Sequence, residues 1–293
     1  MHYPVSKFEI EKMQAFGSPV LEFANYCDEQ YQKHPRTTHS HHGLVEILYI
    51  LRGEGMYKIN GVLYPIHAGN LVIYNSDVVH DECVQMPPPP VYGLEISGIQ
   101  TEDLPYSCLL PEGFSPIVPT GERAKEFLKI FDMIYENARR QNPSSMVTAQ
   151  FLMRGLLQMI SELISGGVSD SPNLESTTKA MALGRKMQIY IDEHALDSLS
   201  VQSISERFAI SQTYASRVFK KATGTSLIQY IIQRKIGEAQ NLLLLTDYPI
   251  SDVAKLVGYD NLSHFIKMFT QNVGISPRKY RKQSGMPAAK KEE

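Results

Sequence analysis

The sequence predicts a multidomain α+β protein, with a β-barrel in its N-terminal half and an all-α domain at its C-terminal end. Three observations predict this class. Short strand-like runs separated by Gly and Pro lie between residues 44 and 100, and a helical pattern repeats after about fifty residues in the last hundred. The length of 293 residues exceeds that of one ordinary domain. Hydrophobic residues make up 43% and charged residues 20%, which is a globular composition.

The balance of charges changes sign near residue 180, before the helical repeat. Residues 1–179 hold 13 Lys and Arg against 21 Asp and Glu, whereas residues 180–293 hold 16 against 10. A basic domain that follows an acidic one is a candidate for nucleic-acid binding. The three cysteines lack metal or disulfide spacing, and neither a signal peptide nor an apolar run of about 18 residues is present. We therefore expect a cytoplasmic protein that does not contact a membrane.

The first domain is expected over residues 1–115. The run LVEILYIL at 44–51 is apolar and rich in β-branched residues, and Asn60-Gly61 between two short runs is a strong hairpin signal. A further strand is expected at 91–96. Many short strands at near-regular spacing favour a barrel or sandwich over βαβ units.

Residues 116–165 change character. Apolar residues recur at steps of three and four on both sides of Asn142-Pro143, which predicts two amphipathic helices. Their apolar stripes can pack on the β domain, form a dimer interface, or do both. We expect this region to make the protein a homodimer. Residues 166–179 are rich in Gly, Ser, Pro and Asn and are expected to be a linker.

The repeat occupies residues 180–283, and residues 284–293 are expected to form a tail. RVFKKATGTSLIQY at 217–230 matches KMFTQNVGISPRKY at 267–280 in Phe, Gly, Ser and Tyr at one offset. Each copy predicts a short helix, a tight turn and a second helix, which is the helix-turn-helix arrangement.

Small residues mark the contact and the turn of each unit. Ser205 and Ala254 are expected where the two helices touch. The turn suits a residue with positive φ, which is Gly258 in the second unit and Ala209 in the first. A long helix over residues 226–245 joins the units and spans ~30 Å. Successive major grooves lie ~34 Å apart, so one chain would reach two adjacent grooves of double-stranded DNA.

The second helix of each unit is expected to read base edges with its polar face and to pack with its apolar face. In the second unit we expect Leu262, Phe265, Ile266 and Phe269 to face inward. The expected base-reading residues are Thr213, Ser216, Arg217, Ser263, His264 and Lys267. The expected phosphate contacts are Lys220, Lys221, Arg278, Lys279, Arg281 and Lys282.

These residues resemble the DNA-binding domain of the AraC/XylS family of bacterial transcription regulators. The resemblance covers roughly residues 183–283. It is carried by Gly258-Tyr-Asp-Asn-Leu-Ser-His-Phe265 with Phe269, Gly274, Ser276-Pro277 and Tyr280-Arg281, which is nearly the whole family signature. In the family the second helix of each unit reads DNA, which implies that role for the base-reading residues named above. Ala215 is smaller than the apolar residue usual at its position.

The N-terminal half is similar to the cupin-like sensor domain that usually accompanies this DNA-binding domain. The matching residues are His39-Ser-His41, Glu46, Gly53, Gly55, Gly61, Gly69-Asn70 and His80, with Asn70 where the family usually has Asp. The resemblance implies a pocket for a small-molecule effector, and sugars are common inducers in the family. The expected pocket residues are His39, His41, Glu46, His80, Tyr49 and Tyr92.

The histidines leave alternatives open. His39, His41, Glu46 and His80 stand where metal-binding cupins carry ligands for Fe, Mn, Ni or Zn. One alternative is therefore a metal-dependent enzyme fused to a DNA-binding domain. Another is a ligand-independent regulator whose barrel is only a scaffold. A third interpretation concerns the cluster alone: its histidines form hydrogen bonds at the barrel rim and bind no ligand.

We expect polar pocket lining with no metal, no cofactor and no catalysis. The predicted function is a sequence-specific transcription regulator that is controlled by an effector and binds DNA as a homodimer. Contact with RNA polymerase is consistent with that role.

Overall fold

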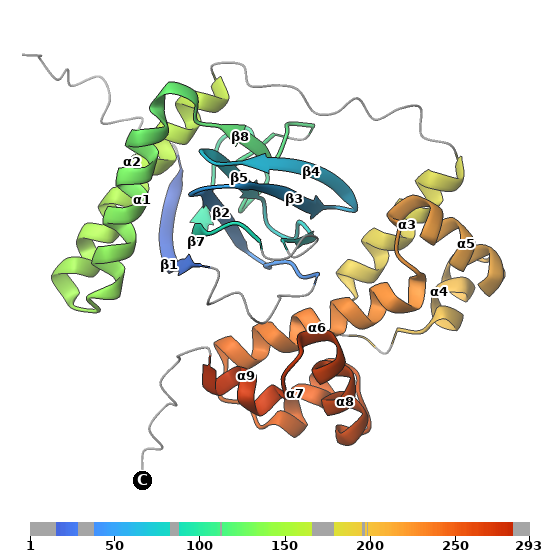
Figure 1. Cartoon of the computed structure of the whole chain (residues 1–293). Coiled ribbons are helices and arrows are strands. Elements are labelled where there is room, and N and C mark those ends of the chain that lie inside the picture. The colour runs from blue at the N-terminus through green and yellow to red at the C-terminus, as the bar shows by residue number, and fades with distance from the viewer. Residues whose placement is uncertain are drawn as a thin grey trace, which may run out of the picture.

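The computed structural model describes residues 16–28, 38–82, 88–111, 113–165, 179–194, 197 and 199–283. Two β-sheets lie between a pair of helices on one side and the C-terminal helices on the other (Figure 1). The expected linker, apart from Lys179, and the expected tail fall outside the described residues. No helix in the described part of the chain is both long enough and apolar enough to cross a membrane.

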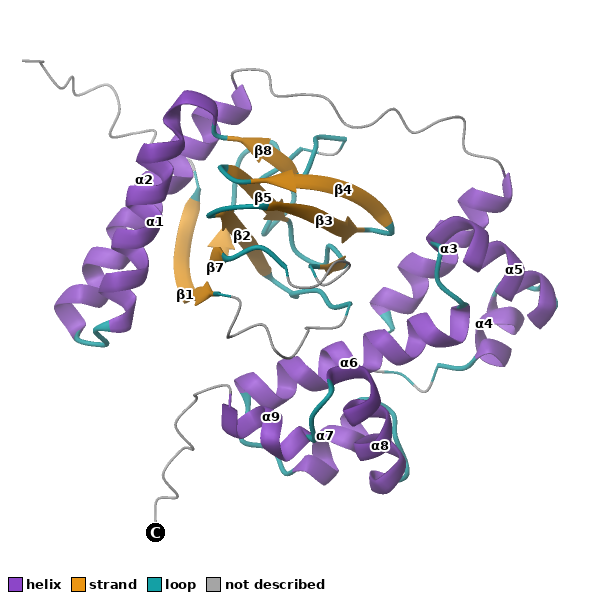
Figure 2. Ribbon diagram, in the orientation of Figure 1, coloured by secondary structure: helices purple, strands orange, loops and turns teal. Residues whose placement is uncertain are grey.

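The strands form two antiparallel sheets (Figure 2). The first sheet has the order β1 (Gly17–Cys27), β7 (Val91–Ile99), β2 (Leu44–Ile50), β5 (Asn70–Tyr74) and β8 (Ile117–Pro119). The second has the order β4 (Val62–His67), β3 (Glu54–Ile59) and β6 (His80–Asp81). The predicted barrel or sandwich is thus confirmed, although β8 lies past the expected domain boundary at residue 115.

The predicted hairpin at Asn60-Gly61 is confirmed. Both residues have positive φ, 47° and 81°, and Ile59 pairs with Val62 across the turn. Positive φ at both central residues gives the turn the twist of the flanking strands.

Three strands were not predicted, for two different reasons. β1 contains Pro19, which a sheet tolerates only at an edge, and β1 is the edge strand of its sheet. Its register also shifts twice along β7. β6 and β8 have two and three residues, too few for any alternation to show in the sequence.

Alternation along β2 separates two cores. Val45, Ile47 and Tyr49 pack with α1 (Ala124–Arg139) and α2 (Pro143–Ser165), the two predicted amphipathic helices. Leu48 and Ile50 point the other way, into an apolar cluster with residues of β3, β4 and β5. At the C-terminal end of β2, side chains therefore fill the space between the two sheets.

The remaining described helices form the C-terminal part. They are α3 (Lys179–Glu193), α4 (Val201–Arg207), α5 (Gln212–Thr223), α6 (Leu227–Leu245), α7 (Ile250–Leu256), α8 (Leu262–Val273) and α9 (Pro277–Gln283). Their two main cores lie on either end of α6. The predicted helix joining the two units is thus confirmed as α6, with Ser226 as its N-cap.

The sequence repeat has a structural counterpart. Phe219 and Phe269 are fully buried, and their rings lie 5.2 Å and 5.6 Å from those of Tyr230 and Tyr280. Gly224 and Gly274 end α5 and α8 in the left-handed conformation. The repeated residues therefore build the same core contact and the same helix end twice.

Candidate functional site

Each C-terminal unit has the tight turn that a helix-turn-helix needs. Ala209 follows α4 with φ of 52°, and Gly258 follows α7 with φ of 75°. Ser205 and Ala254, predicted at the helix contacts, are 3% and 1% exposed. The hydroxyl of Ser205 donates to the carbonyl of Val201 within its own helix, so its burial leaves no unpaired donor.

The second helix of each unit turns its polar residues outward. On α5, Thr213 and Arg217 are exposed and Ser216 is half-buried. The guanidinium of Arg217 lies 5.4 Å from the ring centroid of Tyr214, which holds the long side chain against the helix surface. The side chain of Ser211 accepts the backbone N–H of Tyr214 and begins the helix.

On α8, Ser263, His264 and Lys267 are exposed, and Asn261 caps the helix by accepting the N–H of His264. The predicted base-reading residues of α5 and α8 are thus exposed to solvent, except for the half-buried Ser216. In Figure 1 neither helix is covered by the sheets.

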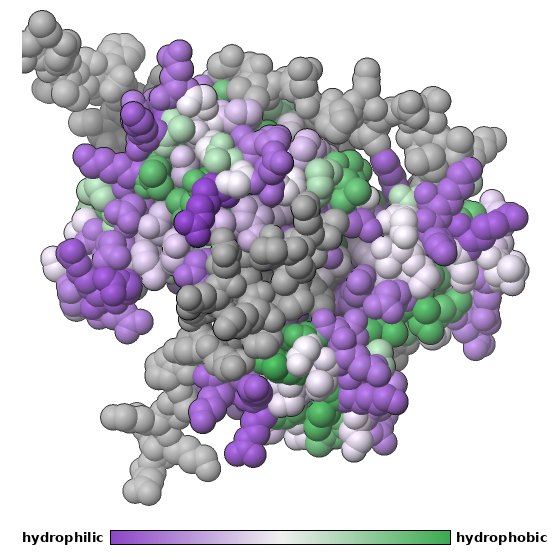
Figure 3. Space-filling view, viewed as in Figure 1, coloured by the Kyte–Doolittle hydropathy of each residue, from purple (hydrophilic) through white to green (hydrophobic). Residues whose placement is uncertain are grey.

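The prediction that Leu262 and Ile266 face inward is wrong. They are 40% and 37% exposed, because the buried face of α8 follows Phe265, Phe269 and Val273 at steps of four. Figure 3 shows hydrophobic patches within the hydrophilic surface over the C-terminal helices. Sequence reasoning missed this exposure because it assigned every apolar residue of the helix to the core.

The expected phosphate contacts are exposed with one exception. Lys220, Lys221, Arg278, Lys279 and Lys282 are exposed. Arg281 is half-buried, and its Nε donates to the carbonyl of Leu243 at 3.3 Å. This guanidinium therefore helps to hold α9 on α6 and is less available to DNA than its neighbours.

The four predicted cupin residues converge at the other end of the space between the sheets. One side-chain ligand atom from each of His39, His41, Glu46 and His80 lies within 4.8 Å of all the others. All four residues are buried. Nε2 of His80 lies 3.1 Å from Nε2 of His39 and 3.1 Å from Oε2 of Glu46.

Further acidic groups surround this histidine cluster. Oε1 of Glu82 lies 3.5 Å from His80, and Oε2 of Glu95 lies 4.0 Å from Nδ1 of His41. Burial alone lowers the pKa of His80, but Glu82 and Glu46 outweigh it and leave the pKa above its ordinary value. Burial raises the pKa of Glu46, yet His41 and His80 outweigh it and hold the pKa well below the ordinary range. The cluster therefore favours positive charge at its centre.

The cluster fits a divalent transition-metal ion. Nε2 of His41 and Nε2 of His80 each lie 3.1 Å from Oε2 of Glu46, so two imidazole nitrogens and one carboxylate oxygen converge in the buried cluster. Nδ1 of His80 lies 2.8 Å from the carbonyl oxygen of Val78 and donates to it, so Nε2 is the ring nitrogen that would bind an ion, with release of any proton that it carries. Three imidazoles with one carboxylate suit Zn, Fe, Mn, Co or Ni, and such an ion would act as a Lewis acid or a structural centre.

Tyr49 and Tyr92 do not belong to this cluster, contrary to the expected pocket. Both lie in the core against α1, where the Tyr49 hydroxyl donates to the carbonyl of Ala124 and the Tyr92 hydroxyl donates to Asp132. The reason is the two-residue period of a strand, which sends Tyr49 and Glu46 to opposite faces of β2. Tyr74, another tyrosine of the barrel, does lie beside the cluster, and its ring stacks on His80 at 3.9 Å.

Comparison with known proteins agrees with both halves. An AraC-type helix-turn-helix domain matches residues 204–283, and a cupin domain matches residues 30–82. The uncharacterized HTH-type transcriptional regulator YdiP of Escherichia coli is 25% identical over 256 residues, which are 84% of this chain and 80% of that protein. The Msm operon regulatory protein of Streptococcus mutans is 25% identical over 260 residues, which are 88% and 89% of the two chains.

Both halves of the chain are therefore similar to those of AraC-family transcriptional regulators. Among solved structures, the C-terminal domain of AraT, a response regulator from Geobacillus stearothermophilus, matches with 30% identity and a TM-score of 0.36. That match covers 39% of this chain and 95% of the AraT domain.

One departure from the AraC-family pattern has a structural explanation. Asn70 stands where the family usually has Asp, and its Oδ1 accepts the backbone N–H of His67 at 2.9 Å. An Asp would accept the same bond, so the turn at Gly69 keeps its geometry.

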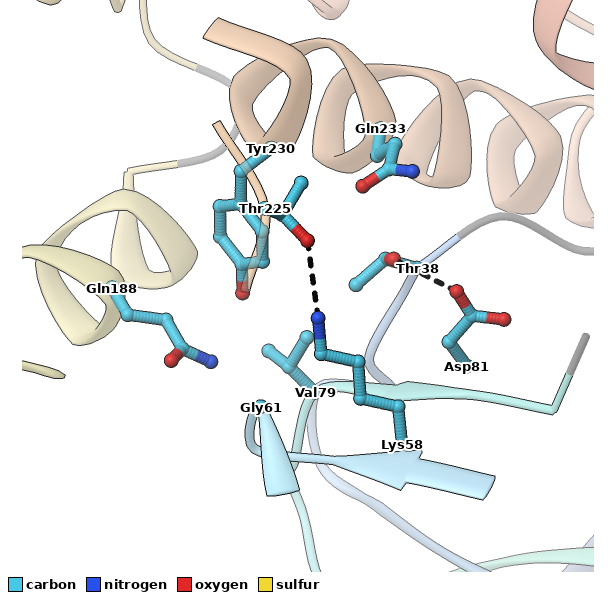
Figure 4. Close-up of a pocket in the computed structure, with 9 residues that line it drawn as sticks. All are labelled: Thr38, Lys58, Gly61, Val79, Asp81, Gln188, Thr225, Tyr230 and Gln233. Carbon is cyan, nitrogen blue, oxygen red and sulfur yellow. Dashed lines mark hydrogen bonds between the residues drawn. The ribbon is translucent and has the colours of Figure 1, made fainter. Parts of the chain in front are cut away.

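The two halves of the chain meet at a small polar cavity (Figure 4). Lys58 of β3 donates to the carbonyl of Thr223 at 2.7 Å and to the hydroxyl of Thr225 at 3.1 Å. Val79 directly precedes β6 in the cupin half, and its side chain is buried in the core formed by α3, α4, α5 and the start of α6. The cupin half therefore touches the first helix-turn-helix unit directly.

Proposed function

We propose that this chain binds double-stranded DNA through α5 and α8 and regulates transcription in response to an effector sensed by its cupin half. One observation carries the proposal: two helix-turn-helix units present exposed polar and basic residues from the two ends of a single helix, α6. α6 has 19 residues, a length of about 28 Å at 1.5 Å per residue. This approaches the ~34 Å between major grooves on one face of DNA.

The proposed division of labour follows the expected domains. Residues 1–115 sense the effector, residues 116–165 dimerise and residues 180–283 bind DNA. The histidine cluster is the proposed sensing site. Tyr49 and Tyr92, the tyrosines expected to line the effector pocket, lie on the other face of the sheet, so these two give no support to a sugar as the effector.

The proposed homodimer uses the outer face of α2. Val147 and Phe151 are 55% and 66% exposed and lie one turn apart on this helix. A large aromatic side chain that is two-thirds exposed favours a partner surface, and a second copy of the chain supplies the same apolar face across a two-fold axis. We place the regulator in the cytoplasm, where it would meet DNA and RNA polymerase, and we propose regulation by binding rather than by catalysis.

The DNA-binding proposal is tested by the salt dependence of binding. Full-length protein is titrated against a fluorescent duplex selected from a random pool, between 50 and 200 mM salt as in standard titrations. We expect log affinity to fall steeply with log salt, because each neutralised phosphate contributes a slope of about −0.9. Lys220→Ala should make the slope shallower by about one, whereas Lys125→Ala on α1 should leave it unchanged. Absent binding, or binding that ignores salt, would overturn the proposal.

A further inference from the structure

The segment Thr38–His41 faces two ways. His39 and His41 are 1% and 6% exposed and belong to the histidine cluster, and His39 exchanges both backbone hydrogen bonds with His80. The residues between and before them, Thr38 and Ser40, face α6 instead. One short segment therefore carries cluster residues on one side and helix contacts on the other.

The contacts to α6 are specific hydrogen bonds. Nη2 of Arg234 donates to the hydroxyl of Ser40 at 3.0 Å, and Nη1 reaches the carbonyl of Thr38 at 3.5 Å. Nδ2 of Asn241 donates to the carbonyl of Ser40 at 3.3 Å. Arg234 is only 1% exposed, so this contact is a buried part of the interface.

Arg234 is also fixed from the other side. Its Nε lies 3.0 Å from Oδ1 of Asp192 on α3, and its Nη2 lies 3.1 Å from Oε1 of Glu238. Asp192 in turn accepts the hydroxyl of Tyr230 at 2.8 Å. The guanidinium thus links the segment to α3 and α6 together, and these two helices support the first unit.

Gly237 lets α6 approach this closely. A Cβ at this position would lie 2.5 Å from the carbonyl oxygen of Thr38 and 3.1 Å from Cβ of His39. No other residue type fits without moving the segment. α6 also shares the core around Ile236 and Phe265 with the second unit. A shift of the segment would therefore move a helix that packs on both α5 and α8.

We propose that a divalent transition-metal ion held by the histidine cluster is sensed by the DNA-binding helices through the segment Thr38–His41, which rests on Arg234 and Gly237 of α6. The inference rests on the proposed function and names both its effector class and its route. An ion fixes the positions of His39 and His41, and the segment between them transmits those positions to α6. By linkage, the ion changes DNA affinity and DNA changes ion affinity by one and the same factor.

The test uses full-length protein, first stripped of metal, with Co²⁺ as the probe. We expect one Co²⁺ per chain, with the visible absorption of a histidine-bound ion, and a change in DNA affinity of at least fivefold on adding it. The same factor should appear in Co²⁺ affinity with and without DNA. His80→Ala and, as a second ligand variant, His41→Gln should lose both the ion and the response, and circular dichroism shows whether each is folded.

Ser40→Ala separates the site from the route. It removes the hydroxyl that accepts from Nη2 of Arg234, but it keeps every ligand and adds no atom beside His39. The variant should bind one Co²⁺ per chain, but its DNA affinity should respond to the ion less than that of the wild type. Ile228→Ala is the matched control, because it changes an exposed residue of α6 away from the segment and should keep the response. Hydrogen exchange provides a second readout: Co²⁺ should slow exchange in the middle of α6 in the wild type and in Ile228→Ala only.

The outcomes distinguish the two proposals. If salt-dependent DNA binding is present but Co²⁺ does not bind stoichiometrically, the metal inference is overturned and the regulator remains. If Co²⁺ binds and Ser40→Ala responds as fully as the wild type, the route through α6 is wrong. If no DNA is bound while Co²⁺ still slows exchange in α6, the proposed function fails and the inferred contact stands.

Discussion

Single small residues decide how closely the helices of this protein meet. A Cβ on Gly184 of α3 would collide with Cβ of Ala222 and lie 3.0 Å from the carbonyl oxygen of Val218, both on α5. Gly237 allows an equally close approach of α6 to the cupin half. Packing at this distance leaves no room for adjustment, because protein interiors are filled to crystal-like density.

The two turn residues provide a residue-scale prediction. Ala209 holds φ of 52°, where an L-residue with a Cβ costs ~1–2 kcal/mol. Ala209→Gly removes this cost but adds ~0.4–1 kcal/mol of unfolded-chain entropy. We expect a net stabilisation of up to about 1 kcal/mol, seen as a rise of a few degrees in the thermal transition of the helical part.

Gly258→Ala is the reciprocal variant and should lower that transition. It introduces the left-handed cost, and its Cβ would lie 2.9 Å from Nζ of Lys235 and 3.3 Å from the carbonyl oxygen of Asp197. Circular dichroism of both variants against the wild type checks the pair. A shift in the same direction for both would show that turn strain does not govern the stability of these units.

Residue types in the sequence predicted the histidine cluster, but not which face of its element each residue occupies. His39, His41, Glu46 and His80 were predicted together, and the structure brings them together. Tyr49 was misplaced because only the two-residue period of β2, counted from Glu46, decides its face. Ile266 was misplaced because its apolar character was taken as burial, although the buried face follows other positions. When residue type and periodicity disagree, periodicity is therefore the better guide to the face that a residue occupies.

At the scale of elements, the two units share one construction and differ in their readers. α5 carries Arg217 stacked on Tyr214, whereas α8 carries His264 beside Tyr259 and exposed apolar residues. Both helices begin at a side-chain cap and end at a left-handed glycine. The long helices were predictable because their apolar period is sustained, while β6 and β8 were not because pairing, not local pattern, defines them.

The element-scale prediction sorts base contacts from phosphate contacts. Arg217→Ala and His264→Ala should each relax preference at particular base pairs, at a cost of ~1–3 kcal/mol for a good contact. Lys282→Ala, at the exposed end of α9, should instead weaken binding to all sequences alike. Binding to a library of single-base variants of the selected duplex measures all three. Identical profiles for the three variants would mean that the sorting is wrong.

At the scale of the whole molecule, the contact between the halves lay beyond sequence reasoning. Arg234 and Ser40 are almost two hundred residues apart, and nothing in either neighbourhood marks the other. Hydrogen bonds join the halves from Arg234 of α6 to Ser40 and from Lys58 of β3 to the carbonyl of Thr223, and Figure 1 shows the second sheet beside the C-terminal helices. The charge asymmetry between an acidic and a basic half was visible in the sequence, and it is consistent with this pairing.

The second whole-molecule feature is the proposed dimer, whose face the sequence left open among Leu152, Leu156 and Leu163. Leu156 is fully buried between the helices and the sheet, and the other two are partly buried in the same core. Phe151, at 66% exposure, is the residue best placed to meet a partner. Phe151→Glu would put an unpaired charge into an apolar contact, which is costly, whereas in a monomer the same change lies in water.

We therefore expect Phe151→Glu to convert a dimer into a monomer without lowering the thermal stability of the cupin half. Light scattering of the full chain at micromolar concentration measures the mass, and the wild type should have twice the chain mass of 33.1 kDa. Leu63→Glu is the matched control: Leu63 is 51% exposed on β4 of the other sheet, so this variant should remain dimeric. A monomeric wild type, or a dimeric Phe151→Glu, would remove α2 as the interface.

Loss of the dimer should also weaken binding to a duplex with two half-sites more than binding to a duplex with one half-site. The reason is that the second contact is then no longer intramolecular.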